Sequence, residues 1–227
     1  MQDAAQKPAR TAAAARHPPR ARKSIGAVRS PETHRAILAA AAEILDEVGY
    51  TGFSMDALAR RASSSKPTIY RWWRNKAALI MEVYEDANEA ALAGTDTGSL
   101  RGDLISRLRG LWTWWDDSWA GEALRSVIAE AQLDAATLDE LRNRFIPRRS
   151  AFVRLVFDRA VARGKLRDGP GVDIAVAQLV AMSWFHLLTR RLGEREAIEP
   201  HVDAVLKGLE ADKAYRPPVK QKPVKGT

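Results

Sequence analysis

The sequence predicts an all-α protein of about nine or ten helices. Apolar residues recur every three or four positions along most of the chain, as on the buried face of a helix. No segment alternates apolar and polar residues as a half-buried strand does. Serine, asparagine and proline stand where the helical segments begin, and glycine where several end.

The N-terminal helices are predicted from their capping residues. Ser30 precedes a helix that Gly49 ends, and Ser54 and Ser65 precede two shorter helices. Asn75 then precedes a fourth helix. We expect residues 31–76 to form a three-helix domain, and residues 77–210 a second helical domain.

The segment after residue 100 contains further helical stretches. Pro147 is expected to break the segment that begins at Thr137, with a new helix over residues 148–163. The helix from Asp173 to about Leu192 is apolar almost all round, so it needs cover on both sides. Apolar residues then form a stripe on the last helix, at Ile198, Val202, Val205, Leu206 and Leu209. We expect these two helices to pair with those of a second copy; the alternative is a buried central helix in a monomer.

Positive charge is concentrated at the ends of the chain. The net charge of +8 divides into +6 over residues 1–30, +2 over 31–80, −4 over 81–210 and +4 over 211–227. The two basic ends, residues 1–30 and 211–227, are expected to be disordered tails that are attracted to polyanions. Arg20, Arg22, Lys23 and Arg29 could reach DNA next to the main contact, or simply keep the chain soluble.

The composition also bears on the location of the protein. The absence of cysteine excludes disulfides and cysteine-based metal sites, and no secretory signal is recognised at the N-terminus. The longest apolar stretch, from Ile174 to Leu188, is shorter than the ~20 residues that a bilayer requires. We therefore expect a cytoplasmic protein without a membrane partner.

The segment "SSSKPTIYRWWRNKAAL" indicates contact with DNA. Two short helices joined by a tight turn form a helix-turn-helix, whose second helix enters the major groove. Lys66, Pro67 and Thr68 would read base edges, because Lys can donate to guanine and the Thr methyl can contact thymine. Ile69 and Trp73 would face inward. The predicted DNA-binding residues are Ser54, Ser65, Lys66, Pro67, Thr68, Tyr70, Arg71, Trp72 and Lys76.

Residues 33–80 resemble the N-terminal domain of the TetR family of transcriptional repressors. The resemblance lies in "RAILAAAAEILDEVGYTGFSMDALARRA" and "SKPTIYRWWRNKAAL", with Tyr70, Trp73, Lys76 and Leu79 at the family's recurring positions. It implies a ligand-responsive repressor that binds a palindromic operator as a homodimer, without a cofactor. It also implies that residues 31–76 form a helix-turn-helix DNA-binding domain and that residues 77–210 form a helical regulatory and dimerisation domain. This chain has Ser63 where the family often has glycine, so Ser63 is expected to adopt a positive φ at some cost.

Tryptophans in the second half of the chain suggest either core packing or a cavity for an apolar effector. The predicted ligand-binding residues are Trp112, Trp115, Trp119, Glu130, Trp184 and His186. The arginines at 142, 144, 148 and 149 are expected to form a solvated face near Asp139 and Glu140.

Two functions other than a DNA-binding regulator are alternatives for this sequence. An all-helical enzyme is disfavoured, because the histidines show no metal-ligand spacing and the sequence has no Gly-rich phosphate loop or nucleophile elbow. No metal site is expected. An architectural protein that binds DNA through its tails alone, regardless of sequence, stays the other alternative.

Overall fold

The computed structural model describes residues 30–91 and 96–212. The two expected disordered tails and the basic residues near position 20 lie outside these ranges, apart from Ser30 and the last residues of α10. The described elements are α1 (Pro31–Gly52), α2 (Met55–Arg61), α3 (Lys66–Trp72), α4 (Lys76–Ala91), α5 (Leu100–Asp117), α6 (Trp119–Ala131), α7 (Ala135–Glu140), a π-helical turn (Leu141–Phe145), α8 (Ile146–Ala162), α9 (Pro170–Leu188), a 3₁₀ turn (Arg195–Ala197) and α10 (Ile198–Asp212).

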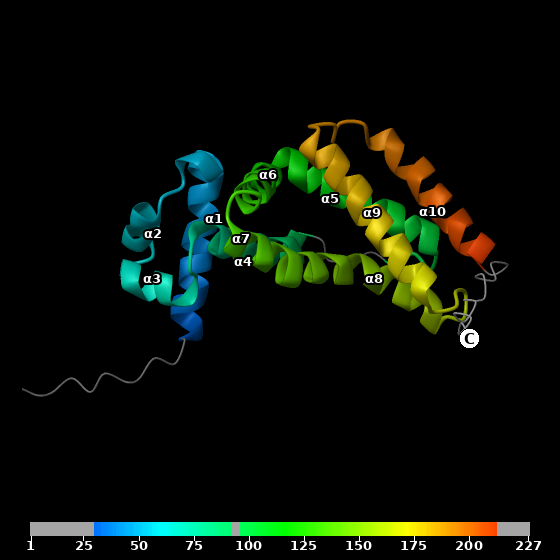
Figure 1. The fold of residues 1–227 in the computed structure, drawn as a ribbon, viewed down its shortest axis with the longest axis horizontal. Helices are drawn as coiled ribbons and strands as arrows, with labels where there is room; N and C mark the ends of the chain where they lie inside the picture. The colour runs from blue at the N-terminus through cyan, green and yellow to red at the C-terminus, as the bar shows by residue number, and fades with distance from the viewer. Residues whose placement is uncertain (1–29, 92–95, 213–227) are drawn as a thin grey trace, which may run out of the picture.

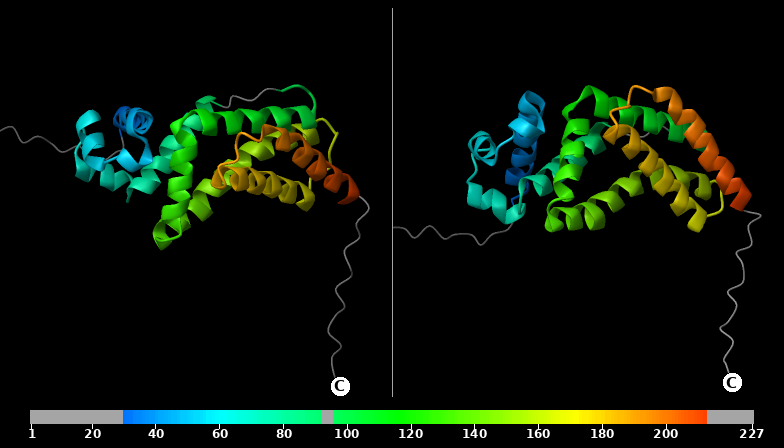
Figure 2. Two further views of the ribbon diagram at one scale, coloured as in Figure 1. Left: turned by 90° about the horizontal axis from the view of Figure 1, so that it is seen from above. Right: turned by 45° about the horizontal axis from the view of Figure 1, so that its top comes forward.

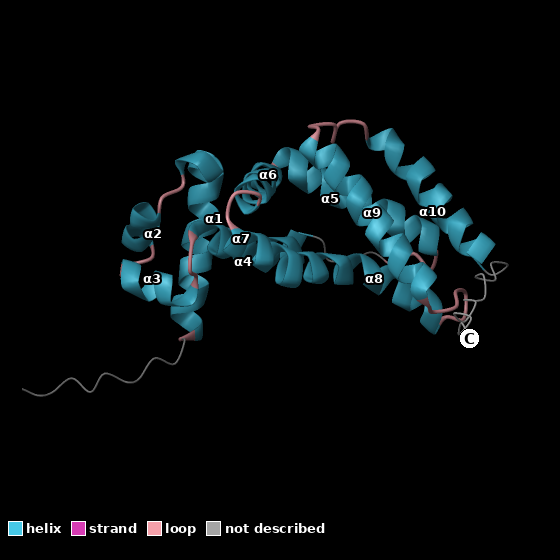
Figure 3. Cartoon of the chain, in the orientation of Figure 1, coloured by secondary structure: helices cyan, strands magenta, loops and turns pink. Residues whose placement is uncertain are grey.

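Helices α1 to α3 lie at one end of an elongated molecule, and α9 and α10 at the other (Figures 1 and 2). All elements in the described residues are helices joined by loops (Figure 3), which confirms the predicted fold class. Helix α4 connects the two ends, since it packs against α1 and also against α6 and α7. One hydrophobic cluster includes buried side chains from both ends, from Ile37 to Val202.

The predicted caps of the N-terminal helices are confirmed. Ser54 Oγ accepts from the Ala57 amide at 3.1 Å and Ser65 Oγ from the Thr68 amide at 3.2 Å. Asn75 Oδ1 accepts from the amide of Ala78 at 2.8 Å. Each bond satisfies an amide that has no partner inside its helix, so these caps fix where the helices begin.

The regular geometry of helix α1 ends at Gly49, as predicted. Gly49 has φ +63°, which interrupts the helical geometry, but the chain then makes another turn as far as Gly52. Glycine accepts this left-handed conformation at little cost. The extra turn places Tyr50 in the core, where only 7% of its surface is exposed.

The prediction that Pro147 breaks the helical segment is wrong. The chain continues from α7 through the π-helical turn into α8, with Pro147 in the first turn of α8. Within the wide turn the amide of Ile146 donates to the carbonyl of Leu141, five residues earlier. The hydrogen-bond register of the helix therefore changes at this turn. Pro147, which has no amide hydrogen to donate, is tolerated just after the change.

Helix α9 begins and ends earlier than predicted. Pro170 occupies its first turn, and the helix ends near Arg190, whose φ of +58° is incompatible with continuing it. Among the described residues, α9 alone is long and apolar enough to cross a membrane by length and composition. The helix is longer than the apolar stretch from Ile174 to Leu188 because it begins at Pro170, and it packs between α8 and α10.

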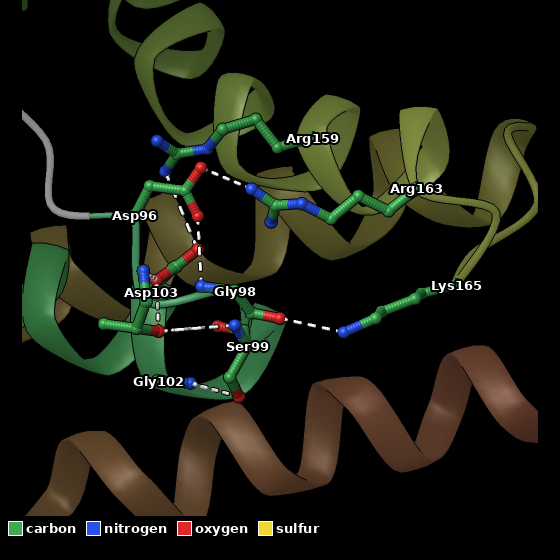
Figure 4. A network of polar contacts seen from close by, with 9 residues as sticks. Asp96, Gly98, Ser99, Gly102, Asp103, Arg159, Arg163 and Lys165 are labelled. Atoms are coloured by element: carbon green, nitrogen blue, oxygen red, sulfur yellow. Dashed lines mark hydrogen bonds and ion pairs between the residues drawn. The ribbon is translucent and has the colours of Figure 1, made fainter.

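A polar network fastens the beginning of α5 to the end of α8 (Figure 4). Asp103, which is 2% exposed, accepts from the backbone amide of Thr97 at 2.7 Å and from its hydroxyl at 2.5 Å. Asp96 pairs with Arg163, and Lys165 donates to the carbonyl of Gly98 at 2.9 Å.

The substitution Asp103→Ala is expected to destabilise the fold by about 1–3 kcal/mol, because the amide and the hydroxyl of Thr97 lose their acceptor. Chemical denaturation measures this difference. Asp117→Ala, at the exposed end of the same helix, is the control and should change stability by less than about 0.5 kcal/mol. Equal effects of the two substitutions would contradict the structural role of Asp103.

Candidate DNA interface and ligand cavity

The helix-turn-helix consists of α2, a short turn and α3. Met55, Leu58 and Ile69 are buried where α2 packs against α1 and α3 packs against α2. Trp73, 2% exposed, closes the same core, so Ile69 and Trp73 face inward as predicted. Ser63 in the turn has φ +47°, which confirms the strained conformation expected where the chain lacks glycine.

The outer face of α3 carries most of the predicted DNA-binding residues. Lys66, Pro67, Tyr70 and Arg71 are exposed and Thr68 is partly exposed. Lys66 Nζ lies 2.5 Å from Asp56 Oδ1 on α2. Because both partners are exposed, this ion pair contributes little to stability and can be exchanged for a contact with DNA.

The two capping serines are both exposed at the helix starts. Each Oγ accepts a backbone amide, and the Ser65 hydroxyl also lies 2.8 Å from Thr68 Oγ1. A hydroxyl that accepts a cap bond still has a proton to donate. The hydroxyl of Ser54 or of Ser65 can therefore cap its helix and donate to a phosphate at the same time.

Trp72 and Trp73 have different positions. Trp72 is partly buried, and its ring lies 6.1 Å from His34 and 5.6 Å from Trp73. Trp73 Nε1 donates to Glu82 Oε2 on α4 at 2.6 Å. His34 stacks on Trp73 at 5.3 Å and is 2.8 Å from the other oxygen of Glu82. Glu82 thus links α1, the end of α3 and α4.

Lys76 lies apart from the α3 surface. Its partly buried ammonium donates to the carbonyl of Tyr50 at 2.6 Å and lies 3.8 Å from the centre of the Tyr50 ring. Burial lowers the pKa of Lys76, and the nearby Glu130 opposes that shift. The Tyr50 hydroxyl donates to Glu130 on α6 at 2.5 Å; burial, followed by this bond, raises the pKa of Tyr50. Lys76 therefore joins α4 to α1 and lies close to α6.

Two exposed arginines were missed by the sequence analysis. Arg60 lies in the last turn of α2, and Arg74 follows α3. Both arginines are close in sequence to α3, and this closeness could have identified them, because cations that flank a recognition helix contact phosphates. Arg61, in contrast, pairs with both carboxylate oxygens of Glu47, at 2.7 and 2.8 Å.

Two family models match the chain. "Bacterial regulatory proteins, tetR family" matches residues 37–83, and "Tetracyclin repressor-like, C-terminal domain" matches residues 95–205. The chain belongs to the TetR family. It is accordingly a DNA-binding transcriptional regulator and not an enzyme.

Relatives within the TetR family cover most of the chain. The uncharacterized HTH-type transcriptional regulator YdeS of Bacillus subtilis is 32% identical over 163 residues, 72% of this chain and 82% of YdeS. The DNA-binding transcriptional repressor TetR of Mycobacteroides abscessus is 37% identical over 160 residues, 69% of this chain and 80% of that protein. The crystal structure of the TetR-family regulator SCO0332 superposes with a TM-score of 0.69 at 29% identity, covering 78% of this chain and 98% of SCO0332.

The second half of this TetR-family chain encloses a cavity between α4, α5, α6, α8 and α9. Its volume is about 40 Å³. That space admits water but is far below the ~300–1,000 Å³ of pockets that enclose drug-sized ligands. The described lining residues are mostly apolar, with Asn88, Arg107, Arg149 and Ser183 as polar exceptions.

Only part of the predicted ligand-binding set lines this cavity. Trp115 and Trp184 do. Trp112 and His186 instead pack against each other in the core, with ring centres 4.5 Å apart. Trp119 contacts Trp114 at 6.3 Å. Glu130 also lies away from the cavity, since its carboxylate holds the Tyr50 hydroxyl.

The arginine run is only partly a solvated face. Arg142 and Arg144 pair with Asp139 and Glu140 as expected. Arg149 instead lines the cavity and contacts Asn88. The signal was its spacing from two buried or partly buried aromatics, Phe145 and Phe152, at four and three residues. Among the described residues, no cluster of His, Asp or Glu could hold a metal ion.

Proposed function

We propose that this protein is a homodimeric transcriptional repressor in the cytoplasm that inserts α3 into a palindromic operator and releases it when a ligand enters the α4–α9 cavity. One observation carries the DNA-binding part. The N-terminal half of α3 is exposed while its opposite side is anchored by Ile69 and Trp73. A helix that is held rigidly on one side and exposed at its N-terminal end can contact base edges in the major groove.

The comparisons support the assignment by analogy. The relative from Mycobacteroides abscessus is named a repressor. BioQ was crystallised with its double-stranded DNA operator and shares the fold, with a TM-score of 0.51 at 21% identity. We assign DNA binding to residues 31–76 and regulation to residues 77–210, with α4 as the physical connection.

We assign the dimer surface to α8 and α9. Exposed apolar residues repeat along one face of α9 at steps of four, four and three residues, at Ala177, Ala181, Phe185 and Leu188. Leu155 on the adjacent α8 is exposed as well. Such a stripe on two neighbouring helices suits a four-helix interface around a two-fold axis.

The predicted contribution of α10 to this interface is wrong in part. Ile198 and Val202 are fully buried, and α10 packs against α5 and α9 of the same chain. Their apolar surface is already used inside the protomer, so it is not available to a second copy. The predicted role of α9 stays a prediction.

Phe185→Asp is expected to convert the dimer into monomers, because it places a charge in the middle of the apolar stripe. Analytical ultracentrifugation at micromolar concentration measures the change. Leu133→Asp, at a residue that is 92% exposed, is the matched control and should leave the dimer intact. A Phe185→Asp protein that keeps its dimeric mass would exclude this surface.

Ligand coupling would proceed through α4. Tyr84 and Asn88 on this helix line the cavity, whereas Lys76 and Glu82 on the same helix contact the DNA-binding helices or their flanks. A ligand that favours a different position of α4 would change the separation of the two recognition helices. It can do so only by its difference in affinity between the two states.

Footprinting on the DNA that flanks the protein's own coding region tests the proposal. We expect protection of a palindrome, with two half-sites about 10 base pairs, or a multiple of that, apart. Uniform protection without a preferred site would instead support the architectural alternative, in which only the tails bind DNA.

A further inference from the structure

Two polar side chains of α4 line the cavity one helical turn apart. Tyr84 and Asn88 are separated by four residues, so they lie on the same face of the helix. Both residues are 2% exposed. Each carries a neutral group that can donate a hydrogen bond. The cavity therefore has a hydrogen-bonding wall on the helix that connects the two ends of the molecule.

The amide of Asn88 has one donor group that is not used. Arginine has only donors, so Arg149 on α8 takes the Oδ1 of Asn88 as its acceptor. The Nδ2 of Asn88 is buried and has no hydrogen-bond partner among the described residues. A buried donor without an acceptor is unfavourable for the protein. An acceptor in the cavity would remove this cost.

The hydroxyl of Tyr84 also has a hydrogen to donate. Its oxygen accepts from the indole N–H of Trp115 at 2.6 Å, and an indole N–H can only donate. Burial raises the pKa of Tyr84, although the charge of Arg149 and hydrogen bonds from Trp115 and Arg149 oppose this rise. The phenol therefore keeps its hydrogen at neutral pH. The described residues supply no acceptor for that hydrogen.

The other polar groups of the wall are engaged within the protein. Ser183 donates to a backbone carbonyl of its own helix at 2.9 Å. Arg107 and Arg149, which together with Asn88 form the charged end of the cavity, lie 5.5 and 4.3 Å from the centre of the Phe152 ring. Both arginines have further interactions within the chain. A ligand therefore needs no charge of its own to complete this wall.

The rest of the described wall favours an uncharged ligand. Leu108, Leu111, Val180 and Trp184 give an apolar surface. Burying a charge against such a surface costs much more free energy than burying a carbonyl group that accepts hydrogen bonds. A ligand thus finds two neutral donors on α4, and hydrocarbon and aromatic surface elsewhere.

We propose that the effector is a neutral carbonyl compound with an aromatic or aliphatic body, whose carbonyl oxygen accepts from Tyr84 and Asn88 while its body packs on α5 and α9. A carbonyl oxygen has two lone pairs, so one oxygen can accept both hydrogens. This inference rests on the proposed ligand response and names the chemical class of the ligand. It adds a defined polar group to the apolar effector expected from the tryptophans.

Such a ligand would act directly on α4. About 40 Å³ cannot hold a phenyl ring together with a carbonyl group, so binding must move the walls. The carbonyl oxygen would hold α4, while the body of the ligand takes up space beside α5 and α9. Lys76 and Glu82 on α4 contact the DNA-binding end of the molecule, so a shift of α4 would reach the recognition helix.

The test compares three probes that share a phenylethyl group: 4-phenyl-2-butanone, 2-methyl-4-phenyl-1-butene and 3-phenylpropionate. The alkene has the shape of the ketone without its acceptor oxygen, and 3-phenylpropionate carries a charged carboxylate instead. Isothermal titration of the full-length protein measures the three affinities. The ketone should bind more tightly than the carboxylate, because its carbonyl group costs less to bury. Equal or tighter binding of the carboxylate, or no binding of the ketone at millimolar concentration, would overturn the inference.

Two variants measure the contribution of the α4 donors. Asn88→Asp keeps an acceptor for Arg149 but removes the donor, and Tyr84→Phe removes the hydroxyl but keeps the ring. Each should lower the ratio of ketone affinity to alkene affinity roughly 2- to 10-fold, the equivalent of one hydrogen bond. Asn143→Asp, at an exposed residue outside the cavity, is the matched control and should leave the ratio unchanged.

The two variants also protect the test against a failure to fold. Circular dichroism shows whether each variant is folded, and either folded variant suffices to measure the ratio. A ratio equal to that of the wild-type protein in a folded variant would overturn the inference. If neither variant folds, the comparison of ketone and carboxylate on the wild-type protein still decides.

Operator binding separates this inference from the proposed function. A wild-type protein that binds its operator specifically while ignoring all three probes refutes only the carbonyl effector. A protein without any specific DNA site refutes the proposed function itself. Release of operator by 4-phenyl-2-butanone, but not by 3-phenylpropionate at the same concentration, would support both.

Discussion

The double variant Lys66→Ala/Thr68→Ala is expected to bind its operator about a hundredfold more weakly than the wild-type protein, because each base contact in the major groove contributes about 1–3 kcal/mol of discrimination. Both side chains belong to the first turn of α3, and neither is buried. Loss of Lys66 also breaks its ion pair with Asp56, but exposed pairs of this kind contribute little to folding. The fold should survive.

Fluorescence anisotropy at one fixed salt concentration measures the effect, with operator and scrambled duplexes compared side by side. Affinity for the scrambled duplex should fall much less than affinity for the operator. Lys207→Ala, which removes an exposed cation on α10, is the matched control and should leave the ratio unchanged. If the double variant loses affinity for both duplexes to the same degree, α3 supplies charge rather than sequence recognition.

Gly121→Ala is expected to destabilise the protein by about 1–3 kcal/mol or more, because the new methyl group has no room. A Cβ at this position would lie 2.3 Å from the carbonyl oxygen of Trp115. The obstacle is backbone rather than a flexible side chain, so α5 and α6 would have to separate at their junction. Thermal or chemical denaturation measures the loss, which corresponds to roughly 2–4 °C per kcal/mol in a chain of this size.

The same substitution at Gly208 should have the opposite sign. Gly208 lies in α10, and an added Cβ would contact nothing within 4 Å. Alanine is favoured over glycine inside a helix by about 0.5–1 kcal/mol, so Gly208→Ala should stabilise the protein. Similar effects of the two alanines would show that backbone crowding at Gly121 does not control the α5–α6 junction.

The N-terminal domain was largely predictable because its signals are local. Ser54, Ser65 and Asn75 cap helices through bonds to amides three residues away, and such contacts depend on the neighbouring sequence alone. The positive φ of Ser63 was expected from the family resemblance, since members of the family often have glycine at this position. The DNA-binding roles given to the exposed side chains of α3 stay predictions until binding is measured.

The cavity was much harder to predict. Its charged end combines Asn88 from α4, Arg107 from α5 and Arg149 from α8, and residues so far apart in sequence are brought together only by helix packing. The tryptophans were misleading for the same reason. Trp112 and Trp115 are three residues apart, yet the first packs on His186 in the core and the second lines the cavity.

By itself, the sequence determined the helical class, the position of the helix-turn-helix and the inward orientation of Ile69 and Trp73, since periodicity and capping act over a few residues. Only the tertiary structure decided that Lys76 binds the Tyr50 carbonyl, that Ile198 and Val202 of the α10 stripe are buried within their own chain, and that Arg149 contacts Asn88. These outcomes depend on which helix faces meet, and long-range packing is not encoded in any short segment.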